Sequence, residues 1–449
     1  MSRWLTAPVA VACGLLMAPL AAHPVLSFAV ASHKESPAGL KSSTGQAVPS
    51  SDERFALTVT LGHQYLIVEA RGARTIYDFA RQRILRLNLT SKTYTDDSLY
   101  MDIAFRAAEF QNRLRLGAAL QAAKLDAVLA QVHLTEQLFS LTDPKHPTDI
   151  DEHHSDGQTL FSWQDHKLVS VSDKTRELPP SYQSEYWRFL RYYAGGHPKI
   201  YAALASVQGV PDKITFVLPN LQAETREIAL NGIHVEADAP YSLDGFTRTM
   251  PDQAPYSTLK LLGPNAAAQL AQRVDATVKD RNAAFSQGHV LDALLANMAL
   301  SLMTGSKTDE AAWMAQHRDS IQSDESARLL TANLNPRDQA SAKSAVQTLA
   351  ELREQPGPAR YVLDVFQGNT LLGLRNTQSG EDHLLMALTA NPFLLGAWSD
   401  LGGYYYQTFQ TDKAWACWDA ARSVSPQHAQ LLPITQLEER LRMTFPEFF

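Results

Sequence analysis

Apolar and polar residues alternate along the first part of the chain, in the pattern of β-strands. Residues 55–61 read FALTVTL, and the β-branched and aromatic run HQYLIVEA follows at residues 63–70. Residues 85–89, LRLNL, return to the same period of two. This spacing gives each strand one apolar face and one polar face, which is typical of antiparallel sheets. We therefore expect a meander with hairpin turns near Gly62 and Gly72.

Helices and further strands are expected after this meander. The apolar period lengthens at residues 101–141, which predicts one or two helices, broken near Gly117, that lie on the apolar face of the meander. Residues 181–196 predict a helix that stops at a Gly-Gly pair. Together with the meander, these elements predict an α+β domain over residues 52–262. Its remaining strands are expected as a hairpin at residues 158–173 and at 213–220, 225–237 and 257–262.

The pattern changes after Pro264, where the strand signals cease. Successive segments with helical spacing follow, separated by Gly, Ser, Asn or Pro. Short helices joined by short turns predict an all-α stack over residues 263–449. The expected fold class is therefore α+β: an N-terminal antiparallel sheet domain with packed helices, followed by an all-α domain of helical repeats.

The N-terminus has the composition of an export signal. Arg3 supplies positive charge, and an apolar stretch of moderate length follows it. Small residues permit cleavage after Ala22 or after Ala31, and prolines make a permanent membrane helix the poorer interpretation. We expect a signal peptide at residues 1–31 and a periplasmic or secreted protein with no transmembrane segment after cleavage. Residues 32–51 are rich in Ser, Gly and Pro, which predicts a flexible linker.

Charge and cysteine content narrow the classes of partner and of chemistry. The formal net charge is −7 and no run of Lys and Arg stands out, so a nucleic-acid partner is not indicated. Cys13 lies inside the apolar N-terminal stretch rather than at its end, which argues against a lipidated cysteine. Cys417, between Trp415 and Trp418, is expected to be a small buried residue rather than a nucleophile.

The clearest motif spans residues 398–426. Its first half fits W-x2-L-G-x2-Y, and its second half has a small residue, an aromatic residue, an Ala and a Pro in that order. The matching residues are Trp398, Leu401, Gly402, Tyr405, Ala414, Trp418, Ala421 and Pro426. The segment resembles the tetratricopeptide repeat, a helix-turn-helix of about 34 residues. In that register the small residues would let the two helices approach, and the aromatic residues would fill the space between them.

A shift of one repeat length toward the N-terminus gives a weaker match, so the resemblance covers about residues 361–428. In the weaker repeat, Asp364 and Leu371 stand where the signature has Trp and Tyr. A third repeat that begins near residue 327 is left open by the sequence. The segment after the last repeat, to residue 449, suits a capping helix.

The resemblance also implies a binding surface. In this family, residues of the first helix line a concave groove that binds peptides or protein segments, and the matching positions here are Ser399, Gly403, Tyr406 and Gln407. The leading hypothesis is therefore an exported cell-envelope scaffold that binds a protein or peptide partner. Because the repeats are few, an array that only packs on the first domain is the alternative.

Two other segments contain residues suited to ligands. Residues 146–157, HPTDIDEHHSDG, hold histidines and carboxylates. Adjacent His153 and His154 cannot readily face one ion, so a solvated polar loop is favoured over a metal site. The aromatic residues of the helix at 181–196 are suited to a pocket, although core packing is the favoured interpretation of them.

Catalytic signatures do not stand out in the sequence. It has no G-x-S-x-G nucleophile turn, no phosphate loop and no dinucleotide-binding turn. We therefore assign no catalytic residue, cofactor or metal, and expect a binding protein rather than an enzyme, with a hydrolase as a minor alternative. A lipid or lipoprotein carrier with an apolar cavity in the sheet domain is the second hypothesis, and it rests only on the pattern of the meander.

Overall fold

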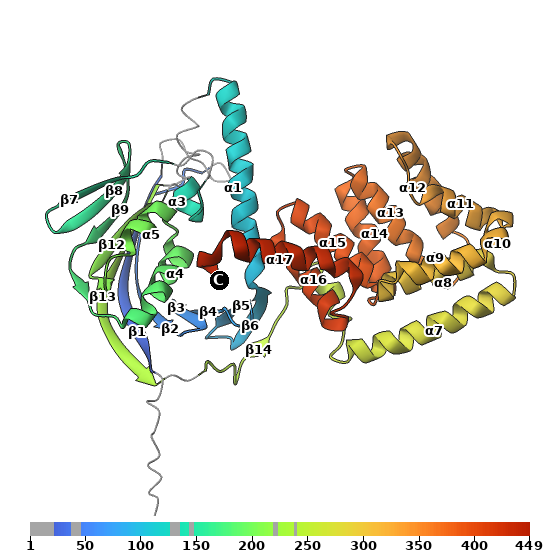
Figure 1. The fold of residues 1–449 in the computed structure, drawn as a ribbon, viewed down its shortest axis with the longest axis horizontal. Coiled ribbons are helices and arrows are strands. Elements are labelled where there is room, and N and C mark those ends of the chain that lie inside the picture. Colours follow the sequence, from blue (N-terminus) through green and yellow to red (C-terminus); the bar gives the residue numbers. More distant parts are fainter. Residues whose placement is uncertain (1–21, 37–45, 126–134, 143–147, 219–222, 238–239) are drawn as a thin grey trace, which may run out of the picture.

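The computed structural model describes residues 22–36, 46–125, 135–142, 148–218, 223–237 and 240–449. The N-terminal part is a large curved sheet with helices against one face, and the C-terminal part is a stack of antiparallel helices (Figure 1). The predicted α+β fold class with an all-helical C-terminal region is confirmed. Most of the predicted signal peptide, residues 1–21, lies outside the described residues.

Within the described residues, the main sheet has twelve strands in the order β14-β6-β5-β4-β3-β2-β1-β13-β12-β9-β8-β7. Neighbouring strands are antiparallel, except that β14 runs parallel to β6. The predicted meander and the predicted hairpin at residues 158–173 are both confirmed. The strands are β1 (Ala22–Glu35), β2 (Ser51–Leu61), β3 (Tyr65–Ala70), β4 (Ala73–Asp78), β5 (Arg83–Asn88), β6 (Thr93–Ser98), β7 (Asp151–Ser155), β8 (Gln158–Trp163), β9 (His166–Ser172), β12 (Lys213–Leu218), β13 (Ala223–Ala237) and β14 (Thr247–Arg248), with β10 (Thr175–Arg176) and β11 (Val210–Pro211) paired separately.

β1 occupies the middle of the sheet, between β2 and β13. The predicted linker at residues 32–51 is therefore wrong where β1 continues to Glu35 and where β2 begins at Ser51, and the sheet domain begins at Ala22 rather than at Asp52. Four apolar side chains of β1 are buried in the core: Val25, Leu26, Phe28 and Val30. The sequence interpretation missed this strand because its alternating residues directly follow an apolar stretch that has the composition of a signal peptide.

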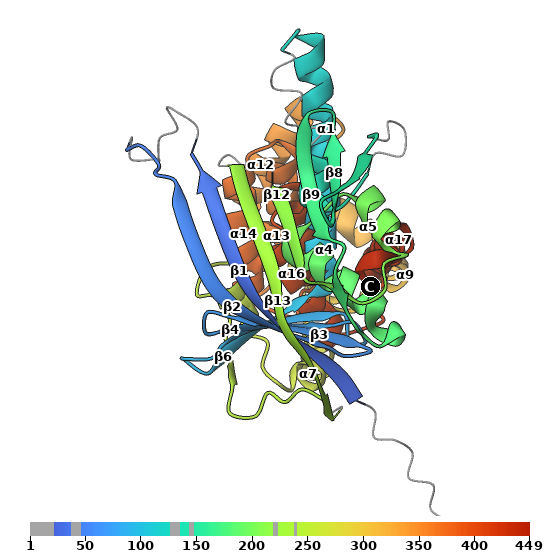
Figure 2. The same cartoon turned by 90° about the vertical axis from the view of Figure 1, so that its left-hand side faces the viewer.

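Helices cover the concave face of the sheet: α1 (Leu99–Ala122), α3 (Thr135–Phe139), α4 (Gln183–Ala194) and α5 (Pro198–Leu204) (Figures 1 and 2). α4 buries Tyr186, Phe189 and Leu190 completely, and the ring of Phe189 stacks on Phe28 of β1 with 5.8 Å between centroids. Core packing of the aromatic helix is therefore confirmed. These side chains fill space that the carrier hypothesis assigns to a lipid.

Two sequence predictions in this domain are wrong. Gly117 does not break the helix, because α1 continues through it to Ala122. A single glycine inside a helix costs only about 1 kcal/mol, which packing elsewhere readily offsets. Residues 257–262 were expected as a strand, but α6 (Tyr256–Leu259) forms there. Tyr256 and Leu259 are three residues apart, so one turn of helix buries both of them.

A second, smaller core lies on the opposite face of the meander. Ile76, Leu85 and Leu87 are buried there against Tyr241 and Phe246 of the segment that connects the two domains. The hydroxyl of Tyr241 also donates a hydrogen bond to Asp78 at the end of β4. The connecting segment is therefore packed on the sheet rather than free of it.

The C-terminal part consists of helices packed in antiparallel pairs. α13 and α15 begin at residues 361 and 395, and their partners α14 and α16 begin at 377 and 411, so both spacings are 34 residues. A third pair, α11 and α12, precedes them at the position that the sequence left open. The helices are α7 (Ala266–Ser286), α8 (Val290–Thr304), α9 (Lys307–Gln316), α10 (Arg318–Ser323), α11 (Glu325–Asn333), α12 (Gln339–Arg353), α13 (Tyr361–Gly373), α14 (Thr377–Ala390), α15 (Leu395–Gln407), α16 (Thr411–Val424) and α17 (Leu432–Thr444).

Glycines set the approach of the two helices within a pair. A Cβ atom at Gly402 of α15 would lie 2.6 Å from Cδ1 of Trp418 on α16, closer than real contacts allow. In the preceding pair, a Cβ atom at Gly368 would lie 3.0 Å from the backbone oxygen of Gly380. At neighbouring Gly403, by contrast, a Cβ atom would meet nothing within 4 Å. Gly402 therefore faces the close contact between the two helices, whereas its neighbour Gly403 faces open space.

We expect Gly402→Ala to lower the free energy of unfolding by about 2 kcal/mol, because overpacking a core costs about 1–3 kcal/mol. Gly403→Ala should raise it by about 0.5–1 kcal/mol, because alanine favours the helix over glycine and the site has room. Urea unfolding followed by circular dichroism measures both changes. Equal effects of the two substitutions would contradict the assignment of the two faces of α15.

Candidate functional site

The four predicted groove residues lie along α15 but differ in their contacts. The Ser399 hydroxyl donates a 3.3 Å hydrogen bond to the backbone oxygen of Gln430, so it is bound to the segment that follows the array. Tyr406 packs against Trp415 and Trp418 of α16, with both pairs of ring centroids 5.9 Å apart. Gly403 is half-buried beside open space, and Gln407 is exposed. Gly403 and Gln407 are therefore the two positions of this set with room for a ligand.

One repeat length earlier, α13 offers equivalent positions at Asn369 and Gly373. The Asn369 side-chain amide donates a 2.7 Å hydrogen bond to the carboxylate of Asp400 on α15, which links the two first helices. Burial raises the pKa of the Asp400 carboxyl, while the hydrogen bond from Asn369 and the charge of Lys307 oppose this shift. Gly373 is exposed and, like Gly403, has nothing within 4 Å of the position of a Cβ atom.

A hollow of about 780 Å³ lies beside these α13 positions, where the α11–α12 turn meets the C-terminal end of α13. We call it the turn hollow. Its lining includes apolar Leu334 and Phe366, the amide of Asn369, and the charged residues Arg337, Asp338 and Arg375. The sequence interpretation did not single out these residues, because they belong to turns rather than to the signature of the repeat.

The charges in the turn hollow are not balanced. Among the described residues, neither Arg337 nor Arg375 has an ion pair. Asp338 is occupied instead as the N-cap of α12, where its carboxylate accepts hydrogen bonds from the backbone N–H and the hydroxyl of Ser341, both at 2.8 Å. The backbone N–H of Ser341 lowers the pKa of Asp338. Among the described residues, the hollow therefore contains two cations without an ion pair and one carboxylate whose Oδ1 caps α12.

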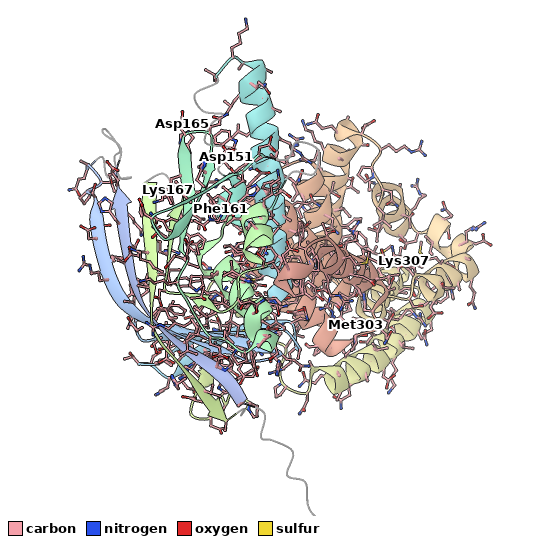
Figure 3. All side chains as sticks on the ribbon, turned by 60° about the vertical axis from the view of Figure 1, so that its left-hand side comes forward. Asp151, Phe161, Asp165, Lys167, Met303 and Lys307 are labelled. Atoms are coloured by element: carbon pink, nitrogen blue, oxygen red, sulfur yellow. The ribbon has the colours of Figure 1, made fainter. Side chains whose placement is uncertain are left out.

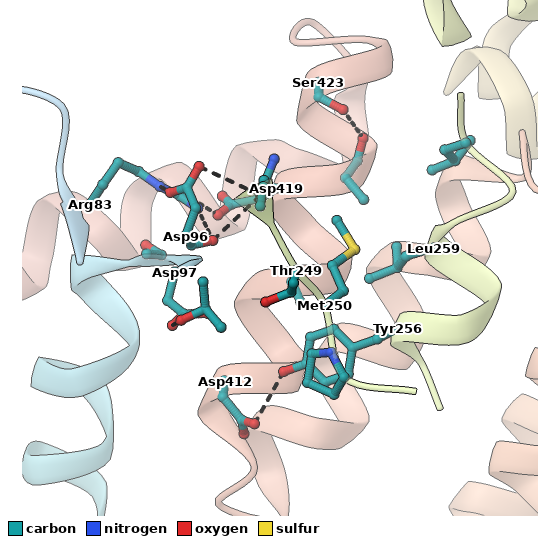
Figure 4. Close-up of a pocket in the computed structure, with 17 residues that line it drawn as sticks. Arg83, Asp96, Asp97, Thr249, Met250, Tyr256, Leu259, Asp412, Asp419 and Ser423 are labelled. Carbon is teal, nitrogen blue, oxygen red and sulfur yellow. Dashed lines mark hydrogen bonds and ion pairs between the residues drawn. The ribbon is translucent and has the colours of Figure 1, made fainter. Parts of the chain in front are cut away.

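A second pocket, of about 360 Å³, lies between the sheet domain and the outer face of α16 (Figure 4). Arg83 of β5 crosses this junction: it bonds Asp96 of β6 at 2.6 Å and Asp419 of α16 at 2.5 Å. Burial opposes the charge on Arg83, but Asp419 and Asp96 outweigh that effect and raise its pKa. The Tyr256 hydroxyl also bonds Asp412 at 3.2 Å. These contacts join the two domains.

The C-terminal residues strengthen the same junction. After α17 the chain returns to the sheet domain, where the Tyr192 hydroxyl of α4 donates a 2.7 Å hydrogen bond to the backbone oxygen of Phe448. The Phe448 side chain is fully buried, and Phe449 packs on Tyr100 of α1 with 5.3 Å between ring centroids. One continuous apolar core therefore extends through both domains.

The histidine-rich segment lies at the opposite edge of the sheet. Residues 151–155 form the exposed edge strand β7, rather than the predicted loop, with Asp151, labelled in Figure 3, at its start. In Figure 1, β7 lies on the far side of the sheet domain from the helical array. His153 and His154 are consecutive in the strand and so point to opposite faces. In the described part of the chain, no group of three or more His, Cys, Asp or Glu residues could hold a metal ion. His146 lies outside the described residues.

Cys417 is buried as predicted, and burial raises the pKa of its thiol. A buried thiol that stays protonated is a poor nucleophile, so this residue adds packing rather than reactivity. Within the described residues, no helix has the length and apolar character needed to cross a bilayer. Neither the family models nor the curated proteins with which the chain was compared show a match.

Proposed function

We propose that this protein is a scaffold that binds a protein partner through its helical array, and that α11 to α16 form repeats of the tetratricopeptide type. One observation carries the proposal: the first helices of two successive pairs both present a glycine with open space beside it, Gly403 on α15 and, one helical turn further along its own helix, Gly373 on α13. A purely structural array would be expected to fill such positions with larger side chains. The 34-residue spacing of the pairs supports the assignment to this type.

The attachment of the array to the sheet domain supports the role of a scaffold. The ion pairs of Arg83 and the buried Phe448 join the two domains through a shared core. A binding surface held in this way loses little conformational freedom when it binds, which favours affinity. The sheet domain thus serves as the platform that fixes the orientation of the array.

We also propose that the protein is exported by a signal peptide cleaved after Ala22. Cleavage after Ala31 would remove most of β1, together with its four buried side chains. Cleavage after Ala22 leaves β1 almost whole. The cell envelope is therefore the compartment in which we place the partner.

Gly403→Trp tests the proposed binding surface. The substitution should leave the fold intact, because there is room at this position, while the indole should obstruct the face of α15. We expect at least one envelope protein, recovered with the unmodified chain by affinity purification and quantified by mass spectrometry, to fall by about 10-fold, equivalent to about 1.4 kcal/mol of binding free energy.

Met386→Trp is the matched control, since Met386 is 43% exposed on α14, the second helix of its pair. This variant should recover the partner as the unmodified chain does. If all three proteins recover the same set in the same amounts, the open positions on α15 are not a binding surface, and the array is structural.

A further inference from the structure

The turn hollow lies at the turns of the helical pairs, apart from the α15 positions that the repeat pattern indicates. It is formed by the α11–α12 turn, the start of α12 and the C-terminal half of α13. At about 780 Å³ it is large enough for several residues of an extended peptide, since pockets for small ligands are about 300–1,000 Å³. The residues that line the hollow therefore indicate the chemistry of a ligand that would fit it.

The cations of the hollow lack partners within the chain. Arg337 and Arg375 are exposed and have no ion pair among the described residues, unlike Arg353, which pairs with Asp364, and Arg422, which pairs with Glu438. The chain as a whole has a formal net charge of −7, so an unpaired pair of cations contrasts with its average surface. Guanidinium groups bind carboxylates in a bidentate geometry, which gives both affinity and orientation.

The other groups of the hollow suit a polypeptide. Half-buried Leu334 and Phe366 form an apolar wall, and Asn335 and Gln339 add amides that can both donate and accept hydrogen bonds. Asp338 also lines the hollow, but its Oδ1 accepts both hydrogen bonds from Ser341, and among the described residues its carboxylate forms no ion pair with either arginine. A ligand with carboxylates, apolar side chains and backbone amides would satisfy all three kinds of group.

We propose that the turn hollow binds an acidic peptide segment of a protein partner, with Arg337 and Arg375 pairing its carboxylates and the apolar wall receiving an adjacent aliphatic side chain. This inference rests on the proposed protein-binding function and names the chemistry of the partner. The acidic segment would be bound at the turns of the array. Neither Gly403 nor Met386, the positions substituted in the previous test, lines the hollow.

The test uses the full chain and the fluorescein-labelled peptide GELEELEG as the probe, with binding followed by fluorescence anisotropy. We expect saturable binding that weakens as the salt concentration rises from about 50 to about 300 mM, because salt screens exposed charges. The double variant R337Q/R375Q should weaken binding by about 10-fold or more, since each charged hydrogen bond contributes well above a neutral one. The uncharged peptide GQLQQLQG should bind at least 10-fold more weakly than the acidic probe.

R318Q/R328Q is the matched control, because it removes the same charge from two exposed arginines that do not line the hollow. It should change the affinity by less than about two-fold, because neither arginine lines the hollow and exposed charges are screened by salt. Absent or unsaturable binding, or equal loss with both double variants, would overturn the assignment of the hollow. A partner lost with Gly403→Trp would still support the proposed function in that case. Conversely, if the peptide binds through the two arginines but no partner is lost with Gly403→Trp, the result supports the peptide site in the hollow and not the proposed binding surface on α15.

Discussion

A chain that begins at Ser32 is expected to remain unfolded, whereas a chain that begins at His23 should fold like the full-length protein. The shorter chain lacks Val25, Leu26, Phe28 and Val30, and burial of each such side chain contributes about 1.5–3 kcal/mol. The loss of about 6–12 kcal/mol is comparable with the whole stability of a typical domain, about 5–15 kcal/mol.

The loss of β1 also separates β2 from β13 and splits the sheet in its middle. Far-UV circular dichroism and a thermal melt distinguish the two chains, and N-terminal sequencing of the exported protein should begin at His23. A folded chain that begins at Ser32, with a melting temperature near that of the longer one, would contradict the central role of β1.

The second large effect is expected at the buried carboxylate of Asp364. One of its oxygens accepts a 2.6 Å bond from Nε of Arg353 and a 3.0 Å bond from the ring of His383, and its side chain is 1% exposed. Arg353→Met should lower the free energy of unfolding by about 3 kcal/mol, because it leaves this buried charge without its cation. Urea unfolding gives the value.

The double variant Arg353→Met/Asp364→Leu provides the control. An apolar pair of similar volume can replace a buried ion pair at little cost, so the double variant should recover most of the stability lost by the single one. If the single substitution costs less than about 0.5 kcal/mol, or if the double variant is less stable still, then the ion pair does not account for the presence of Asp364.

Asp364 also shows why the segment that forms α13 and α14 matches the signature only weakly. It stands where the signature has Trp, and it fills the position with an ion pair to the preceding pair of helices in place of an indole. The spacing of the apolar residues and of the glycines still predicted the helical pair that α13 and α14 form. The pair formed by α11 and α12 has a similar helical arrangement, but its residues do not match the signature.

Local periodicity was sufficient for the hairpins, for α4 and for the succession of helices, because each is specified by neighbouring residues. It failed for β1, whose role depends on pairing with β13 nearly two hundred residues away, as in the hydrogen bond from Ser32 to Glu224 at a separation of 192. It failed for the turn hollow for the same reason, since Arg337 and Arg375 line one hollow only after α12 and α13 have packed.

The hydrogen bond between Tyr192 and Phe448 spans 256 residues, and this separation has a consequence for synthesis. While the ribosome makes the helical array, α4 has already emerged but lacks the partner that covers Tyr192. The aromatic residues on that side stay incompletely packed until the C-terminal segment reaches α4. Completion of the sheet domain is therefore coupled to completion of the array, and a nascent chain with an unfinished core offers chaperones a long interval in which to bind.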